Sequence, residues 1–174
     1  MGQVATTSPC CFSASCKHNK QIRFRLSKTN PIFREIMLEI PGKDCGSCSF
    51  CCQVLEIEEL NKKAGDLCGH CSASGGCSVY ATRPQVCRDY YCDWKDDRGL
   101  NAQFRPDRIG TLLMEDPDSD EYHAVCDPGK PFSWRNPLIF KHLVNLAKEG
   151  RMVVAKAGLR AWRIFPDGRF QETA

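Results

Sequence analysis

The sequence predicts an α+β fold, in which a small cysteine-rich module is followed by β-hairpins and one packed helix. Nine of the thirteen cysteines lie between Cys45 and Cys92, which marks this stretch as a unit of its own. Beyond it, short apolar runs alternate with turn residues, as in β-hairpins. One longer run repeats apolar residues at helical spacing. A length of 174 residues fits a single domain with a tail.

The chain after residue 104 supplies the hairpins and the helix. Residues 108–115 and 121–126 flank the turn sequence Asp-Pro-Asp-Ser-Asp, and residues 152–155 and 159–165 flank Gly158. Each of these pairs predicts a hairpin. Between the hairpins, Asn136 is a good N-cap and a proline follows at the first helical position. The apolar spacing that follows predicts a helix over 137–149.

The cysteine-rich stretch begins with the strongest signal in the chain. Its sequence is Cys45-Gly-Ser-Cys48-Ser-Phe-Cys51-Cys52, and the Cys-x-x-Cys spacing lets two thiolates hold one metal ion. If the segment is helical, the four thiols fall within an arc of about 120° and can face one pocket. If it is extended, the last two point to opposite sides, which favours either two metal sites or one ligand and one core thiol. Both alternatives stay open. Residues 54–64 predict a short helical insert.

Further candidate ligands follow this motif. They are Cys68, His70, Cys71, Cys77, Cys87 and Cys92. A tetrahedral zinc takes four ligands, and four thiolates also hold one [4Fe–4S] cluster. Nine thiols and a histidine are therefore enough for two sites, and zinc and iron, including an iron–sulfur cluster, are both expected cofactors. Arg83 and Arg88 lie within the cysteine run, where their guanidinium groups can offset thiolate charge.

A disulfide framework is the competing explanation for so many cysteines. Adjacent and near-adjacent cysteines rarely bridge each other, because disulfide geometry is demanding. Residues 1–40 contain no long apolar stretch that ends in a small-residue cleavage site, so a cytoplasmic location is expected. Metal ligation is therefore the favoured interpretation, and the module is expected to be metal-stabilised, with the metal replacing core volume.

Charge and hydropathy argue against two other classes of partner. The chain has 24 basic and 21 acidic residues, and its net charge of +3 is too small to indicate nucleic acid. No apolar run approaches the ~18 residues of a membrane span, so no membrane partner is expected. The expected partner is a metal ion, and the sequence identifies no protein partner.

The cysteine module resembles a known family. The resemblance is carried by Cys45-x-x-Cys48-x-x-Cys51-Cys52, Cys68-x-His70 and Gly76-Cys77-Ser-Val-Tyr80-x-x-Arg83-Pro84-x-x-Cys87-Arg88-x-Tyr90-x-Cys92-x-Trp94. This pattern, over roughly residues 44–94, is similar to the YkgJ-type CxxCxxCC family, whose members are regarded as zinc- or iron-chelating cysteine-cluster proteins. The flagellin lysine N-methylase resembles the family in this module.

The resemblance implies a metal site built from eight cysteines. They are Cys45, Cys48, Cys51, Cys52, Cys68, Cys77, Cys87 and Cys92. Cys71 stands where many family members carry an apolar residue, so its role stays open. Two functions follow from the resemblance. One is a metal-binding protein whose sites are mainly structural, and the other is an iron–sulfur enzyme or electron carrier related to the methylase.

Other motifs have simpler interpretations. Cys68-Gly-His-Cys71 also occurs in thioredoxin-fold oxidoreductases, where it follows a buried strand, but here a polar, glycine-bearing segment precedes it. No catalytic constellation is recognised, since His123 and His142 are isolated in the sequence. The alternating aspartates at 116, 118 and 120 lack the remaining ligands of a calcium loop and are expected to form a turn.

Aromatic side chains near the cysteines are expected to pack around the cluster and exclude water. They are Tyr80, Tyr90, Tyr91 and Trp94. Cys126 lies in a predicted strand, away from the other cysteines, and is expected to be a buried apolar thiol.

The domain organisation predicted from these features is a single cysteine-cluster domain over residues 37–170. It contains a metal module at 44–94 and an α/β part at 104–170. Residues 1–34 have six Lys or Arg and no Asp or Glu. Three interpretations of residues 1–36 stay open: a disordered tail, a targeting segment, and an upstream extension with Met37 as the working start.

Overall fold

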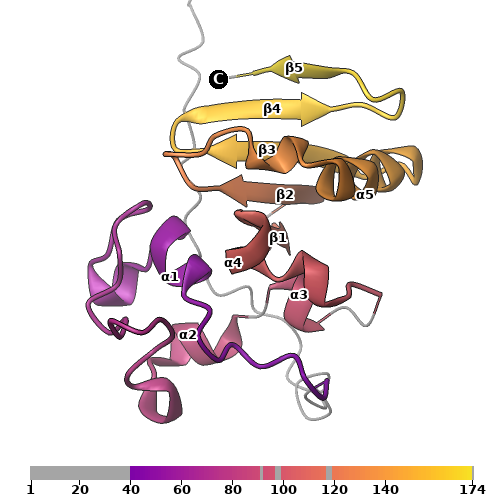
Figure 1. The fold of residues 1–174 in the computed structure, drawn as a ribbon. Helices are drawn as coiled ribbons and strands as arrows, with labels where there is room; N and C mark the ends of the chain where they lie inside the picture. The colour runs from indigo at the N-terminus through magenta and orange to yellow at the C-terminus, as the bar shows by residue number, and fades with distance from the viewer. Residues whose placement is uncertain (1–39, 91, 97–98, 117–118, 174) are drawn as a thin grey trace, which may run out of the picture.

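The computed structural model describes residues 40–90, 92–96, 99–116 and 119–173, and a five-stranded sheet dominates its C-terminal half (Figure 1). The strands follow one another in the order β1 Thr111–Glu115, β2 Glu121–Cys126, β3 Met152–Ala157, β4 Arg160–Ile164 and β5 Phe170–Glu172. Neighbouring strands pair antiparallel, except β2 and β3, which are parallel. Together with the helices, this sheet confirms the α+β prediction.

Helix α5, Pro137–Lys148, connects β2 to β3 and allows their parallel pairing. The Leu138 N–H donates to Asn136 Oδ1 at 2.9 Å, and Pro137 takes the first turn. The cap satisfies a backbone donor that the first turn leaves unpaired. The predicted helix over 137–149 is therefore confirmed.

The two hairpins are also confirmed. Residues 111–115 pair with 122–126, and 153–157 pair with 160–164 around Gly158. The first strand begins later than predicted, because Pro106–Ile109 forms a short helix, α4, that ends at a left-handed Gly110. The sequence did not predict β5 or the parallel pairing of the two hairpins.

The two faces of the sheet are covered by different parts of the chain. Along each strand, side chains alternate between the faces. One face packs under α5 in a large apolar cluster that includes Leu113, Trp134, Leu143, Val153 and Trp162. The other face, at its β1–β2 end, packs against the cysteine-rich module through a smaller cluster of Val54, Leu55, Leu112, Met114 and Val125.

The module itself is built from short elements. Its helices are α1 Phe50–Val54, α2 Gln85–Asp89 and α3 Asp93–Asp96, with 3₁₀ turns at Glu58–Leu60 and Tyr80–Thr82; a further 3₁₀ turn, Ala102–Phe104, precedes α4, and another, Ser133–Arg135, precedes α5. Figure 1 shows the module below the β1 side of the sheet, with α4 next to β1 and α2 farther from the sheet than α1. Isolated helices this short are unstable in water. The short helices of the module therefore depend on tertiary packing.

The predicted helical insert at 54–64 is wrong. Helix α1 already ends at Val54, and Ile57 and Lys62 pair as an isolated antiparallel bridge around the 3₁₀ turn. Asn61 has a left-handed φ of +48°, which reverses the chain. The apolar residues here belong to this tight loop, so their helical spacing did not indicate a helix.

The interpretations of residues 1–36 lie outside the described residues. Within the part of the chain that the structure describes, no helix has the length and apolar character needed to cross a membrane.

The buried face of α5 provides a test of the packing. Leu143 is completely buried, whereas Asn145 on the same helix is exposed. Leu143→Ala is expected to lower the free energy of unfolding by about 2–5 kcal/mol, because it leaves a cavity under the sheet. Urea unfolding monitored by circular dichroism measures this loss. Asn145→Ala is the control, and an equal loss in both variants would contradict the packing described here.

Candidate metal centre

All eight cysteines predicted as ligands line one cavity of about 100 Å³ in the module. They are Cys45, Cys48, Cys51, Cys52, Cys68, Cys77, Cys87 and Cys92. The rest of the wall is largely apolar and includes Leu55, Ile57 and Val86. Because the cysteines are spread over 48 positions of sequence but meet in space, the fold brings together the predicted set without exception.

The first four cysteines are positioned by a turn followed by α1. The Cys48 N–H donates to the Cys45 carbonyl at 2.7 Å, and α1 begins two residues later and carries Cys51 and Cys52. The sulfur atoms of Cys51 and Cys52 lie 4.0 Å apart. The segment is thus a turn followed by a helix, which differs from both predicted alternatives, and its four cysteines all line the cavity.

A loop from residue 68 to 78 forms the second part of the wall. The Cys68 N–H donates to the Cys52 carbonyl at 3.1 Å, and the Cys71 N–H donates to the Cys68 carbonyl at 3.0 Å. Cys71 and Cys77 then pair as an isolated antiparallel bridge. Cys71 does not line the cavity. His70 does line it, so it remains a candidate ligand or donor.

The third part of the cavity wall is the segment 80–87, which Arg83 holds together. Its Nε donates to the Cys87 carbonyl at 3.2 Å and its Nη1 donates to the Tyr80 carbonyl at 2.8 Å. The guanidinium carbon also lies 4.0 Å from the centre of the Tyr80 ring. Arg83 thus fixes the ends of this segment and places a positive charge at the cavity wall. Arg88 instead donates to the Arg83 carbonyl at 2.8 Å and does not line the cavity.

A buried lysine supplies a second positive charge. Lys62 is only 7% exposed, and its Nζ donates to the carbonyls of Gln53 and Leu55 at the end of α1. Burial lowers the pKa of Lys62, while the neighbouring Cys52 and Cys68 oppose that decrease. A buried ammonium needs such acceptors and negative neighbours. Lys62 therefore both caps α1 and favours thiolates beside it.

The thiols differ in acidity because their surroundings differ. A hydrogen bond from the Cys51 thiol, together with one from Cys71 and the charge of Lys62, lowers the pKa of Cys52 to about 6 against the opposing effect of burial. Burial raises the pKa of Cys71, Cys87 and Cys92 to about 11. In the absence of metal, Cys52 is therefore the first of these thiols to ionise, and ionised thiols are the metal ligands.

The thiols surround the cavity without closing on its centre. A tetrahedral zinc with bonds of about 2.3 Å holds its sulfurs about 3.8 Å apart. Within the described residues, no three cysteine sulfurs lie within 4.8 Å of one another. The donor set fits a thiophilic metal, and a zinc ion would draw the thiols inward, whereas a cluster with several irons needs wider spacing.

The aromatic residues predicted around the cluster have different positions. Tyr80 and Tyr90 line the cavity, and the Tyr90 hydroxyl donates to Met114 Sδ at 3.8 Å, which links the module to β1. Trp94 lies in the large core cluster instead. Tyr91 lies outside the described residues. Cys126 is 1% exposed within the core, as predicted for an apolar thiol.

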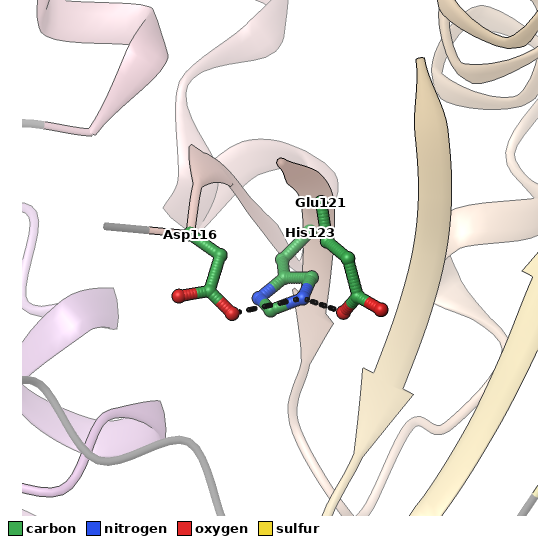
Figure 2. A group of neighbouring side chains, drawn as sticks. All are labelled: Asp116, Glu121 and His123. Carbon is green, nitrogen blue, oxygen red and sulfur yellow. Dashed lines mark hydrogen bonds and ion pairs between the residues drawn. The ribbon is translucent and has the colours of Figure 1, made fainter. Parts of the chain in front are cut away.

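A separate polar group was missed by the sequence analysis. His123 is not isolated, since its Nε2 lies 2.8 Å from Glu121 Oε2 and 3.5 Å from Asp116 Oδ2 (Figure 2). These ligand atoms are close enough to hold a metal ion. However, Lys156 Nζ already lies 3.8 Å from Glu121 Oε2, so the carboxylates have a cationic partner. The arrangement is a polar network at the turn end of the first hairpin, and alternation along the strand was the signal that could have placed His123 beside these carboxylates.

Comparisons with known proteins identify no relative. No family model, curated protein or solved structure matches this chain. The geometry of the cavity is therefore the basis for the proposals that follow.

A matched pair of glycines tests how the loops pack around the cavity. Gly42 and Gly76 both have φ of +79°, but a methyl group on Gly76 would collide with the Gly46 carbonyl, whereas Gly42 faces open space. Both alanine variants are expected to lose about 1–2 kcal/mol from left-handed backbone strain. Gly76→Ala is expected to lose about 1–3 kcal/mol more from the collision. Urea unfolding compares the two, and equal losses would show that this loop contact is absent.

The acidity of Cys52 can be measured by alkylation. In reduced, metal-free protein, iodoacetamide is expected to modify Cys52 before Cys71, Cys87 and Cys92, with a rate that rises with pH around about 6. The reason is that only the thiolate reacts, and it forms as the pH rises through the pKa. Mass spectrometry of the modified peptides gives the rate at each site. In Lys62→Met, the Cys52 midpoint should move to higher pH, and a wild-type midpoint near 9.0, the ordinary value, would contradict the assignment.

Proposed function

We propose that this chain is a metal-binding protein that coordinates zinc or iron through its eight cavity-lining cysteines. The observation that carries the proposal is that all eight, and no other cysteine of the described residues, line the same cavity. Thiolates are the preferred ligands of zinc and of iron–sulfur clusters. The motif resemblance to the YkgJ-type CxxCxxCC family supports the same function.

The state of the cysteines favours metal over a disulfide framework. All ten cysteines of the described residues are free thiols. Cys51 and Cys52 are consecutive, and their sulfur atoms lie 4.0 Å apart, which is too far for a disulfide bond. The two thiols share one wall of the cavity without being bonded to each other. We propose a reducing compartment such as the cytoplasm, because free thiols persist there.

The role proposed for the metal is first structural. The helices and 3₁₀ turns of the module have three to five residues each, and few of its side chains are fully buried. Loops held by so little apolar packing need other cross-links to be stable. A metal held by thiolates from the turn, α1, the 68–78 loop and α2 would supply them.

An iron–sulfur enzyme or electron carrier is the alternative. The wide spacing of the thiols favours it, since it exceeds the spacing of sulfurs around one zinc ion. The cavity also has His70, Tyr80 and Lys95 in its wall, so groups able to donate protons stand beside the candidate ligands.

Anaerobic purification with metal analysis and a visible spectrum separates these functions. A colourless protein with about two zinc ions per chain would support structural zinc. A brown protein that absorbs near ~400 nm and releases sulfide with acid would support iron–sulfur. A protein with neither metal, whose unfolding is unchanged by chelator, would overturn the proposed function.

Cys48→Ser should lose metal and destabilise the module, because it removes a ligand whose binding is coupled to folding. Metal per chain and the unfolding transition are the two measurements. Cys126→Ser is the control, since Cys126 is a cysteine of the core that does not line the cavity. Unchanged metal content in Cys48→Ser would remove Cys48 from the ligand set.

A further inference from the structure

The consecutive residues Cys51 and Cys52 divide the cavity. On helix α1, neighbouring side chains point about 100° apart. Cys51 packs with Phe50, Tyr90 and Cys92 against the apolar cluster on β1 and β2. The Cys52 carbonyl instead accepts from Cys68 on the other loop. The two thiols therefore have different neighbours although their sulfurs are 4.0 Å apart.

The surroundings of Cys51 contain a first group of thiols. Cys92 packs on the same apolar cluster, and Cys45 and Cys48 are held together by their turn. Arg105 connects these two pairs, because its Nη2 donates to the Cys45 carbonyl at 3.2 Å and its guanidinium carbon lies 5.9 Å from the ring centre of Trp94, two residues after Cys92.

The surroundings of Cys52 contain a second group. Backbone hydrogen bonds run from Cys68 to Cys52 and from Cys71 to Cys68, and Cys71 pairs with Cys77. Cys87 joins this group through Arg83, which donates to the Cys87 carbonyl at 3.2 Å and to the carbonyl of Tyr80, three residues after Cys77, at 2.8 Å.

We propose that the cavity holds two separate four-thiolate sites, one made by Cys45, Cys48, Cys51 and Cys92 and the other by Cys52, Cys68, Cys77 and Cys87. The inference rests on the proposed function and adds the number of sites and the ligands of each. Cys71 lies beside the second site as a neighbour of Cys52 and is not one of its ligands, because it does not line the cavity.

Each site has its own source of positive charge. Four thiolates around a divalent ion or a [4Fe–4S]²⁺ cluster leave a net charge of about −2. Arg105 Nη2 donates to the Cys45 carbonyl at 3.2 Å and to Ser47 Oγ at 3.0 Å, which places a guanidinium beside the first site. Lys62 and Arg83 lie beside the second. Neutralisation within each group is consistent with two separate ligand sets.

Cadmium-113 provides a direct probe of the two groups, because it is a thiophilic ion that gives one NMR resonance per distinct site. The full chain is reduced, stripped of metal and titrated with ¹¹³Cd²⁺. Two resonances and about two bound ions per chain are expected, since each ion takes four thiolates. A single resonance with about one ion per chain would overturn the two-site arrangement.

Serine variants then assign the ligands. Cys48→Ser and Cys92→Ser should both lose or shift the same resonance, and Cys77→Ser and Cys87→Ser should both affect the other one. The resonance that remains also shows that the variant is folded. If Cys48→Ser and Cys92→Ser affect different resonances, or if Cys48→Ser and Cys87→Ser affect the same one, the partition is wrong.

Cys71→Ser is the matched control, since it removes a cysteine of the same module that is not assigned as a ligand. Both resonances should persist in this variant, and loss of either would overturn the ligand sets. Failure of the proposed function gives a different result, because a wild-type chain that retains no ¹¹³Cd²⁺ after desalting would show no bound resonance at all.

Discussion

The module depends on how the charge of closely spaced thiols is neutralised. Thiols buried beside one another resist ionisation, which is why the pKa values of Cys71, Cys87 and Cys92 rise to about 11. The apolar wall adds to this effect because it excludes water. Lys62 and Arg83 offset only part of the charge that eight thiolates would carry. A cation bound in the cavity, as proposed above, would offset the remainder.

The sheet gives this module a fixed support. Tyr90 reaches Met114, and Gln53 Nε2 donates to Asp127 Oδ2 at 3.2 Å, so α1 and the segment after α2 are both tied to the β1–β2 hairpin. The same face of the sheet carries His123 and Lys156, which contact the carboxylates of Asp116 and Glu121. The conventional core under α5 lies on the opposite face. The fold thus has a core stabilised by apolar packing on one face of the sheet. The thiol-lined module lies on the other face and is attached through polar contacts and a smaller apolar cluster.

The regular elements were predictable where local signals and burial agree. The Asn136 cap, the helical spacing after it and the turns of the two hairpins each act over a few residues, so the sequence shows them directly. The parallel pairing of β2 with β3 was not predictable, because it depends on where α5 packs. The prediction of a helix at 54–64 was wrong for a related reason. The apolar residues of this segment belong to a tight loop whose reversal depends on a left-handed Asn61 and on Lys62 reaching back to α1.

The candidate site was also only partly predictable from the sequence. Cysteine spacing indicated the nine cysteines of the module as candidate ligands, and the family resemblance implied the eight that line the cavity. Their grouping was not predictable, because it follows from the bridge between Cys71 and Cys77 and from the packing of Cys92 on the sheet. The contacts of His123 were not predicted, because they depend on the strand placing Glu121 on the same face and on the turn bringing Asp116 close.

Helix α1 has a consequence for the order in which metal would be taken up. It carries one ligand of each proposed site on consecutive residues, so a single peptide unit joins the two. Filling either site would immobilise this helix and orient the remaining thiol, so the conformational entropy lost at the first step is not lost again at the second. Loading would then be cooperative, and at limiting metal a population of chains would divide into empty and fully loaded molecules with few in between.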